Sequence, residues 1–176
     1  GAVNTLAIKA GKLYGDNTDG RGLVADLLSQ GVTLKDANVA ILGAGGATRG
    51  AILPLLDAQV KSLHIANRTV EKAENLTRLF DTDKLTFSSL TDLPNDIEVI
   101  INATSIGLSG DTLPFAKDMT VDFAYDMMYG KPSAFLEFFK AKHAKTSDGL
   151  GMLVNQGALS FALWTGKQVD LTNFQF

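Results

Sequence analysis

Short apolar runs alternate along the chain with segments in which apolar residues recur every three or four positions. The continuous runs predict buried strands at 39–42, 62–66, 98–102 and 120–125, with a short strand at 84–88 and an edge strand at 145–148. The segments between them predict helices at 46–56, 71–80, 133–141 and 152–164. This alternation predicts an α/β fold of the Rossmann type, with a doubly wound and mainly parallel sheet.

A separate segment precedes this alternation. Residues 3–8 and 13–15 predict a hairpin that turns at 9–12, and residues 22–30 predict a helix. In three of the predicted helices the apolar spacing assigns four residues each to the buried face: Leu23, Val24, Leu27 and Leu28; Ile52, Leu53, Leu55 and Leu56; and Ala73, Leu76, Leu79 and Phe80.

A glycine-rich turn follows the strand at 39–42 and leads directly into a helix. In the run Gly43-Ala44-Gly45-Gly46-Ala47, Gly43 suits a tight turn and Gly45 allows the backbone to approach a phosphate closely. The helix start adds its dipole and free N–H donors, so the segment predicts a dinucleotide pyrophosphate site. Thr48 stands at the third glycine position of G-x-G-x-x-G, and such turns also occur without a ligand. A purely structural turn is therefore the alternative.

The charges after the next strand indicate which dinucleotide binds. An NAD-binding domain usually has Asp or Glu there, whereas this chain has Asn67-Arg68-Thr69 and then Lys72. Arg68 and Lys72 would pair with a 2′-phosphate, and Thr69 would donate to it, so the predicted cofactor is NADP. The alternative is that both cations are ordinary solvated charges, although cations at a helix N-terminus oppose the dipole.

Polar residues collect where the predicted strands end. Parallel sheets bind ligands outside the carboxyl ends of their strands, so we expect functional residues there. The segments concerned are Asn67-Arg68-Thr69, Asn102-Ala103-Thr104-Ser105, Asp126-Met127-Met128-Tyr129 and Asp148-Gly149.

The composition narrows the range of partners. A chain of 176 residues that is 45% hydrophobic can bury the core of one domain. A net charge of −3 without a basic run argues against nucleic acid and anionic membranes as partners. The chain has no cysteine and two distant histidines, so no metal centre is expected. With no apolar span near ~20 residues and no signal peptide, the expected location is cytoplasmic.

The segment Asp16-Asn17-Thr18-Asp19-Gly20 ends the part of the chain that precedes the predicted helix. Thr18 or Asp19 is expected to cap that helix through its side chain. Two carboxylates within four residues exceed what one cap requires, so Asp19 is also a candidate for proton transfer.

Seven motifs follow one another as they do in shikimate dehydrogenases, and the chain resembles this family over nearly its whole length. They are Asn4-Thr5-Leu6, GDNTDG at 15–20, GAGGATRG at 43–50, Asn67-Arg68-Thr69, Asn102-Ala103-Thr104-Ser105, YDMMY at 125–129 and DGLGMLVNQ at 148–156. The resemblance implies reduction of 3-dehydroshikimate to shikimate with NADPH, in the pathway to aromatic amino acids.

The resemblance also implies a role for each matched residue. Residues 43–47 would hold the pyrophosphate, and Met127 and Gly149 would lie near the nicotinamide. Asp19 would be catalytic and would face the substrate together with Asn4, Tyr129 and Gln156. The 2′-phosphate would be held by Asn67, Arg68, Thr69 and Lys72; the family often has arginine at the last position, and lysine keeps the charge without the fork geometry. The alternatives are that residues 127–129 belong to the core and that Gln156 is an exposed helix residue.

The chain departs from the family in one respect. Shikimate dehydrogenases have a preceding α/β domain that supplies most substrate contacts and a lysine beside the catalytic aspartate, and this chain contains none of it. We therefore expect a single NADP-binding domain over 1–176, with a hairpin or hinge segment at 1–20 and a nucleotide-binding core at 38–165. It should act on its small-molecule substrate only when the missing domain is supplied, and it should form at most a weak homodimer.

Two other functions are compatible with the same residues. One is a stand-alone NADP-binding or regulatory module. The other is a related dehydrogenase of the quinate or methylene-tetrahydrofolate type, with a similar cofactor domain and a different substrate. Asn4, the 17–19 run and Gln156 favour a shikimate dehydrogenase, because a generic nucleotide binder does not need them.

Overall fold

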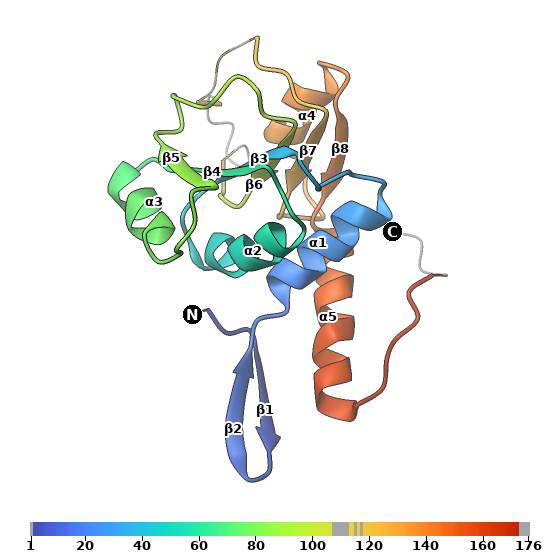
Figure 1. Cartoon of the computed structure of the whole chain (residues 1–176). Coiled ribbons are helices and arrows are strands. Elements are labelled where there is room, and N and C mark those ends of the chain that lie inside the picture. Colours follow the sequence, from blue (N-terminus) through green and yellow to red (C-terminus); the bar gives the residue numbers. More distant parts are fainter. Residues whose placement is uncertain (1, 107–112, 115, 117, 173–176) are drawn as a thin grey trace.

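The computed structural model describes residues 2–106, 113–114, 116 and 118–172. Within them the strands form a six-stranded sheet and a separate two-stranded hairpin (Figure 1). No helix in this part of the chain is long and apolar enough to cross a membrane. In the same residues, no group of three or more His, Cys, Asp or Glu side chains could hold a metal ion.

The six-stranded sheet is parallel throughout. From one edge to the other its strands are β5 (Leu85–Ser88), β4 (Ser62–Ala66), β3 (Asn38–Leu42), β6 (Val99–Asn102), β7 (Phe123–Asp126) and β8 (Lys145–Asp148). Within this sheet the first strand along the chain, β3, lies in the middle. The next two strands, β4 and β5, add on one side of β3, and β6, β7 and β8 then add on the other. This order confirms the predicted Rossmann-type sheet, and it places the point where the winding direction reverses between β3 and β6.

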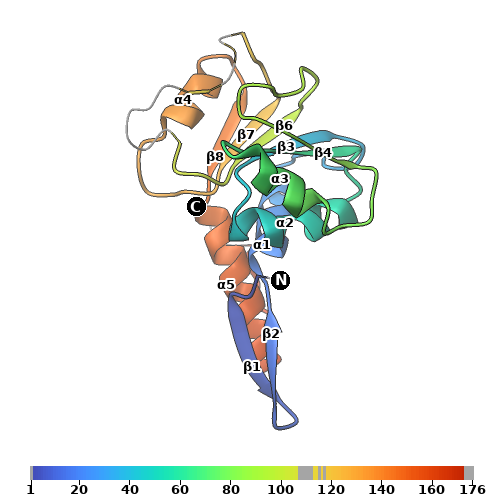
Figure 2. The ribbon, with the colours of Figure 1, turned by 90° about the vertical axis from the view of Figure 1, so that its left-hand side faces the viewer.

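Alternate residues of the central strands enter two different cores. Ile41, Ile65 and Ile101 face α1 (Asp19–Ser29), α2 (Gly46–Asp57) and α3 (Val70–Thr77), whereas Leu42 and Ile100 face α4 (Ala134–Lys140). Figure 2 shows these helix groups on opposite sides of the sheet. Because both faces are covered, the strands read as continuous apolar runs rather than as alternating ones.

The hairpin and the last helix project together from this body. Strands β1 (Thr5–Lys9) and β2 (Lys12–Asp16) are joined through Ala10 and Gly11, both with positive φ, as tight hairpin turns require. Both views show the hairpin beside α5 (Leu150–Thr165). The Trp164 indole N–H donates to the Leu6 carbonyl at 2.8 Å, and the Thr5 and Ser160 hydroxyls lie 2.7 Å apart.

The helix faces differ from the predicted ones at three leucines. Leu28, Leu53 and Leu79 are exposed. Leu28 and Leu53 each follow a buried residue directly, and a step of one residue turns a helical side chain by about 100°, away from the sheet. Leu79 lies beyond α3, which ends at Thr77 rather than at residue 80.

A buried histidine gives the fold a pH dependence. His64 on β4 contacts the Thr86 hydroxyl through Nδ1 and the Ser88 hydroxyl through Nε2, both at 2.8 Å. Ser88 Oγ itself donates to the Ser89 carbonyl, so it accepts from Nε2–H, and in the neutral ring Nδ1 is the acceptor. Burial lowers the pKa of His64 below its usual 6.5, although Asp92 opposes the shift.

We expect the free energy of unfolding to fall as the pH drops below 6.5, because the unfolded chain then protonates His64 while the fold keeps it neutral. Denaturant titrations at several pH values should show this loss in the unmodified chain and a flatter profile in His64→Gln. The exposed His143 provides the control: His143→Asn should keep the slope of the unmodified chain. An unchanged slope in His64→Gln would rule out this residue as the cause.

Candidate functional site

The turn after β3 is held from both sides. Gly43 has a φ of 108°, and a Cβ built on it would lie 2.8 Å from Thr104 Cγ2, so a side chain is excluded there. Thr48 occupies the third glycine position of the motif, and its buried hydroxyl donates to the Gly43 carbonyl at 2.8 Å. The residue that departs from the glycine pattern therefore stabilises the turn itself.

The start of α2 presents its backbone to solvent. Gly45 and Gly46 are exposed, Ala44 and Ala47 are half-buried, and no side chain caps the helix. Uncapped N–H groups at a helix N-terminus favour an anion. This turn lies at the carboxyl end of β3, beside the point where the winding direction reverses.

The predicted 2′-phosphate residues lie at the carboxyl end of the neighbouring strand, β4. Arg68, Thr69 and Lys72 are exposed, and neither cation forms an ion pair with any other described residue. The Asn67 amide donates to the Thr69 carbonyl at 2.8 Å and holds the segment in a turn before α3 begins at Val70. Two unpaired cations thus stand next to the glycine turn at the start of a helix.

A cavity of about 210 Å³ lies near the ends of β7 and β8. It brings together all four predicted substrate residues and both residues predicted to lie near the nicotinamide, although they come from five separate places in the sequence. Its lining consists of Asn4, Asp19, Met127, Tyr129, Gly149, Met152, Leu153 and Gln156. No residue of this lining is basic.

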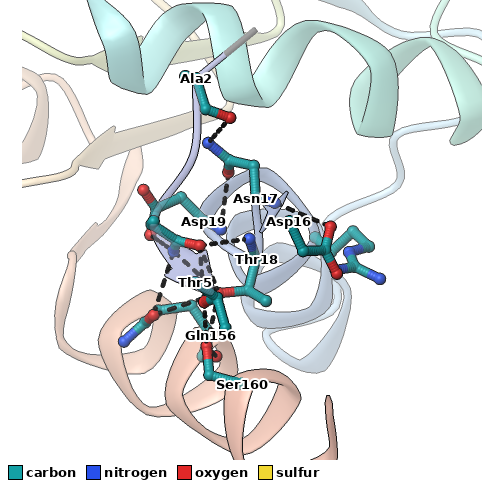
Figure 3. Close-up of polar contacts among 10 residues, drawn as sticks. Ala2, Thr5, Asp16, Asn17, Thr18, Asp19, Gln156 and Ser160 are labelled. Carbon is teal, nitrogen blue, oxygen red and sulfur yellow. Dashed lines mark hydrogen bonds and ion pairs between the residues drawn. The ribbon is translucent and has the colours of Figure 1, made fainter. Parts of the chain in front are cut away.

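Asn4 connects the start of the hairpin to the start of α1. Figure 3 shows Thr18 and Asp19 of this region beside Gln156 of α5. Its amide nitrogen lies 2.7 Å from Asp19 Oδ1 and 2.9 Å from the Thr18 hydroxyl, and its oxygen accepts from the Thr18 backbone N–H at 2.9 Å. Gln156 Oε1 accepts from the Thr18 hydroxyl at 3.3 Å and lies 3.4 Å from the Asn4 amide. Asn4 therefore orients the Asp19 carboxylate, and Gln156 is a half-buried member of this cluster rather than an isolated surface residue.

The prediction that the side chain of Thr18 or Asp19 caps α1 is wrong. Thr18 occupies the N-cap position of α1 but makes no side-chain cap bond, and the Asp19 carboxylate faces Asn4 instead. The Asn17 side chain accepts from the Asp19 backbone N–H at 3.1 Å. The Thr18 hydroxyl does not cap the helix; it is buried and contacts the Ser160 hydroxyl at 3.0 Å. Sequence reasoning missed Ser160, since nothing local marks a serine in an apolar helix as a partner of a residue 142 positions earlier.

The segment after β7 lies against the start of α5. A Cβ at Gly149 would collide with the Met127 carbonyl oxygen, so only glycine lets these two backbones approach so closely. Met127 is half-buried, while Met128 and Tyr129 are 42% and 47% exposed. The alternative that residues 127–129 belong to the core is therefore wrong for Met128 and Tyr129.

Comparison with known proteins identifies the family. A family model described as shikimate/quinate 5-dehydrogenase matches residues 25–109, and one described as the shikimate 5′-dehydrogenase C-terminal domain matches residues 149–173. A shikimate dehydrogenase (NADP(+)) of Acinetobacter baumannii (strain SDF) is 46% identical over 98% of this chain, which covers 68% of that protein. The chain belongs to the shikimate dehydrogenase family.

Other relatives agree with this assignment. The shikimate dehydrogenase (NADP(+)) of Psychrobacter arcticus is 48% identical over 98% of this chain, and the chain spans 66% of its length. The solved structure of shikimate 5-dehydrogenase from Thermus thermophilus, in complex with NADP(H) and shikimate, superposes with a TM-score of 0.82 at 36% identity. It is matched over 96% of this chain and 64% of its own. The chain thus spans about two thirds of the length of these shikimate dehydrogenases.

Proposed function

We propose that the chain is the NADP-binding part of a shikimate dehydrogenase and that it supplies Asp19 to the reduction of 3-dehydroshikimate to shikimate. The observation that carries the proposal is the 210 Å³ cavity, in which Asn4, Asp19, Tyr129 and Gln156 meet Met127 and Gly149. A nucleotide-binding module without a substrate would have no need for this polar cluster. The cavity therefore favours an oxidoreductase over a stand-alone regulatory module.

The residues at the strand ends suit NADP(H). The exposed N-terminus of α2 and the turn at 43–47 would hold the pyrophosphate, and Arg68 and Lys72, with Asn67 and Thr69, would hold the 2′-phosphate. Met127 and Gly149 would lie against the nicotinamide. When bound, the reduced cofactor supplies a hydride to the substrate carbonyl carbon.

Asp19 suits the transfer of the accompanying proton. Asn4 donates to its Oδ1, and no described residue donates to Oδ2. A positioned proton donor beside the substrate oxygen would stabilise the alkoxide that forms as the hydride arrives. The cavity lining contains no cation to hold that proton, so we propose that a basic partner comes from the part of the protein that lies outside this sequence.

A second substrate is favoured by one observation. The family model that matches residues 25–109 describes both shikimate and quinate dehydrogenases. Quinate differs by a hydroxyl and a hydrogen added across the ring double bond of shikimate, and the residues of the cavity would face either compound. The curated relatives at 46–48% identity are shikimate dehydrogenases, which makes shikimate the first proposal.

A thermal melt tests cofactor binding by the chain. A ligand that binds only the folded state raises its stability by RT ln(1 + [L]/Kd), about 2.7 kcal/mol at a hundredfold excess over Kd. We expect saturating NADPH to raise the melting temperature by several degrees, and NADH at the same concentration to raise it less. A melting temperature unaffected by NADPH would contradict the proposed function.

We also propose that the isolated chain dimerises weakly through the hairpin. Leu6, Ile8 and Leu13 are exposed on the same face of β1 and β2, with Trp164 of α5 nearby. An apolar patch of this kind favours association with a second copy. Sedimentation velocity should show a concentration-dependent dimer that is lost in Ile8→Lys. A dimer that persists in the variant would place the contact elsewhere.

A further inference from the structure

Asp126 is a buried carboxylate at the carboxyl end of β7, and the proposed function gives it no role. Its side chain is 1% exposed, yet it receives hydrogen bonds from three parts of the fold. Its Oδ2 accepts from the Ser133 hydroxyl at 2.5 Å, and its Oδ1 accepts from the Asn102 amide at 3.2 Å and from the Met128 backbone N–H at 3.1 Å. The carboxylate thus connects β6, the start of α4 and the segment that carries Met127 and Tyr129.

The same network reaches the glycine turn. Asn102 Oδ1 accepts from both the backbone N–H and the hydroxyl of Thr104, at 3.0 and 2.6 Å. Thr104 lies directly against Gly43, where no side chain fits. A continuous set of contacts therefore runs from the proposed pyrophosphate turn, through Asn102 and Asp126, to the segment at 127–129.

The bond to Met128 N–H fixes the peptide between Met127 and Met128. Backbone hydrogen bonds hold the chain on either side of this peptide. The Met127 N–H donates to the Asn102 carbonyl at the end of β6, and the Met128 carbonyl accepts from the Gly149 N–H before α5. The N–H of the peptide itself donates to the buried Asp126 carboxylate. Without it, the Met128 N–H would lose its acceptor, and the segment could shift relative to Gly149.

Burial of this carboxyl carries an energetic cost. Desolvation raises the pKa of Asp126, while its hydrogen bonds from Ser133, Met128 and Asn102 oppose the rise. An apolar residue in its place would leave the donors of Asn102, Ser133 and Met128 without their acceptor. Its position at a strand end beside the proposed cofactor site points to a role in addition to stabilising the fold.

We propose that Asp126 is a positioning residue that sets the Met127–Tyr129 segment for the nicotinamide half of NADP(H). The inference rests on the proposed function, since it concerns the same cofactor site. Asp126 acts through the backbone of the segment and touches neither cofactor nor substrate. It should therefore affect binding of the nicotinamide half and leave binding of the adenosine half unchanged.

Two ligands separate these halves. The first is NADPH, which spans the whole proposed site, and the second is 2′,5′-ADP, which carries the adenosine and the 2′-phosphate without the nicotinamide. Calorimetric titration of the 176-residue chain with each ligand gives two dissociation constants. We expect Asp126→Ala to weaken NADPH binding about tenfold and to change the Kd of 2′,5′-ADP little. A loss of this size is typical when a hydrogen bond is removed and its donor is left unpaired.

A conservative variant and a matched control define the mechanism. In Asp126→Asn the amide oxygen can still accept from Asn102 and Met128, and its NH₂ can donate to Ser133, so NADPH binding should stay within about twofold of the unmodified chain. Tyr125→Phe is the control on the same strand. It removes the 2.6 Å hydrogen bond from the buried Tyr125 hydroxyl to Asp26, on the other face of the sheet. It should lower the melting temperature without changing the ratio of the two dissociation constants.

The outcomes are distinct. Selective loss of NADPH affinity in Asp126→Ala, restored in Asp126→Asn, supports the inference. Equal weakening of both ligands in the alanine variant, or the same ratio change in Tyr125→Phe, would show a general effect on the fold and overturn it. If the unmodified chain binds neither ligand, the proposed function fails first. If Asp126→Ala does not fold, two other variants test the ratio of the NADPH and 2′,5′-ADP dissociation constants. Asp126→Asn and Ser133→Ala both leave an acceptor for the Met128 N–H in place. A selective loss of NADPH affinity in either variant would contradict the inference.

Discussion

Replacing Asp19 by alanine should lower kcat by about a hundred- to ten-thousandfold, the range expected when a positioned acid–base group is lost. The assay joins this chain to the remaining third of a family-length shikimate dehydrogenase, because the cavity by itself contains no cation to pair with the carboxylate. The Kd for NADPH should stay close to that of the unmodified protein, since Asp19 lies on the proposed substrate side. The chain alone should show little or no shikimate oxidation, because misplacing either reactant or proton donor costs orders of magnitude in rate.

Asp16 provides the matched control. It is a second carboxylate three residues earlier, and its Oδ2 pairs with the exposed Arg21 at 2.6 Å, outside the cavity. Asp16→Asn should retain nearly full activity. Full activity of the Asp19→Ala protein would remove Asp19 from proton transfer, and rapid turnover by the chain alone would contradict the proposed need for a partner domain.

Replacing Arg68 by alanine should abolish most of the preference for NADPH over NADH. A charge-assisted hydrogen bond to a phosphate contributes about 1.5–3 kcal/mol, which is roughly a ten- to hundredfold change in affinity. The affinity for NADH should change little, because NADH lacks the 2′-phosphate. Titrations that follow the fluorescence of the bound nicotinamide measure both constants directly.

The control for Arg68 lies at the other end of the same helix. Arg78 follows α3 and pairs with Glu74 at 2.7 Å in an exposed position, so Arg78→Ala changes the net charge equally without altering the proposed site. It should keep the preference for NADPH. An Arg68→Ala variant that still discriminates as well as the unmodified chain would place the 2′-phosphate elsewhere.

The sheet and the location of the site follow from local sequence signals. The apolar runs predicted six strands within a few residues of their limits, with the largest difference at β7, which spans Phe123–Asp126 rather than 120–125. Because the strands are parallel, knowing where each ends was enough to gather Asn67, Asn102, Asp126 and Asp148 at one edge of the sheet. The family resemblance added Asn4 and Gln156, which spacing alone did not assign, whereas Met152 and Leu153 of the cavity lining were assigned by neither.

The connections between these residues could not be predicted. Asn4 contacts Thr18 and Gln156 only because the hairpin, α1 and α5 converge, and no local pattern specifies that meeting. Ser160 looks in sequence like an ordinary polar residue of a helix. Asp126 was expected near the site, but nothing in the sequence indicated that it would be buried. Helix periodicity assigned Leu28 and Leu53 to the core because it measures spacing and does not show how wide a stripe the sheet covers.

We propose that this chain holds NADP(H) through the turn at 43–47 and the cations after β4. This proposal can be tested by a calorimetric titration of the unmodified chain with NADPH and with NADH, in the same buffer at low salt. We expect one binding site per chain and an affinity for NADPH at least about tenfold higher than for NADH, because NADPH alone offers the 2′-phosphate to the cations. Equal affinity for the two cofactors, or no binding of either, would contradict it.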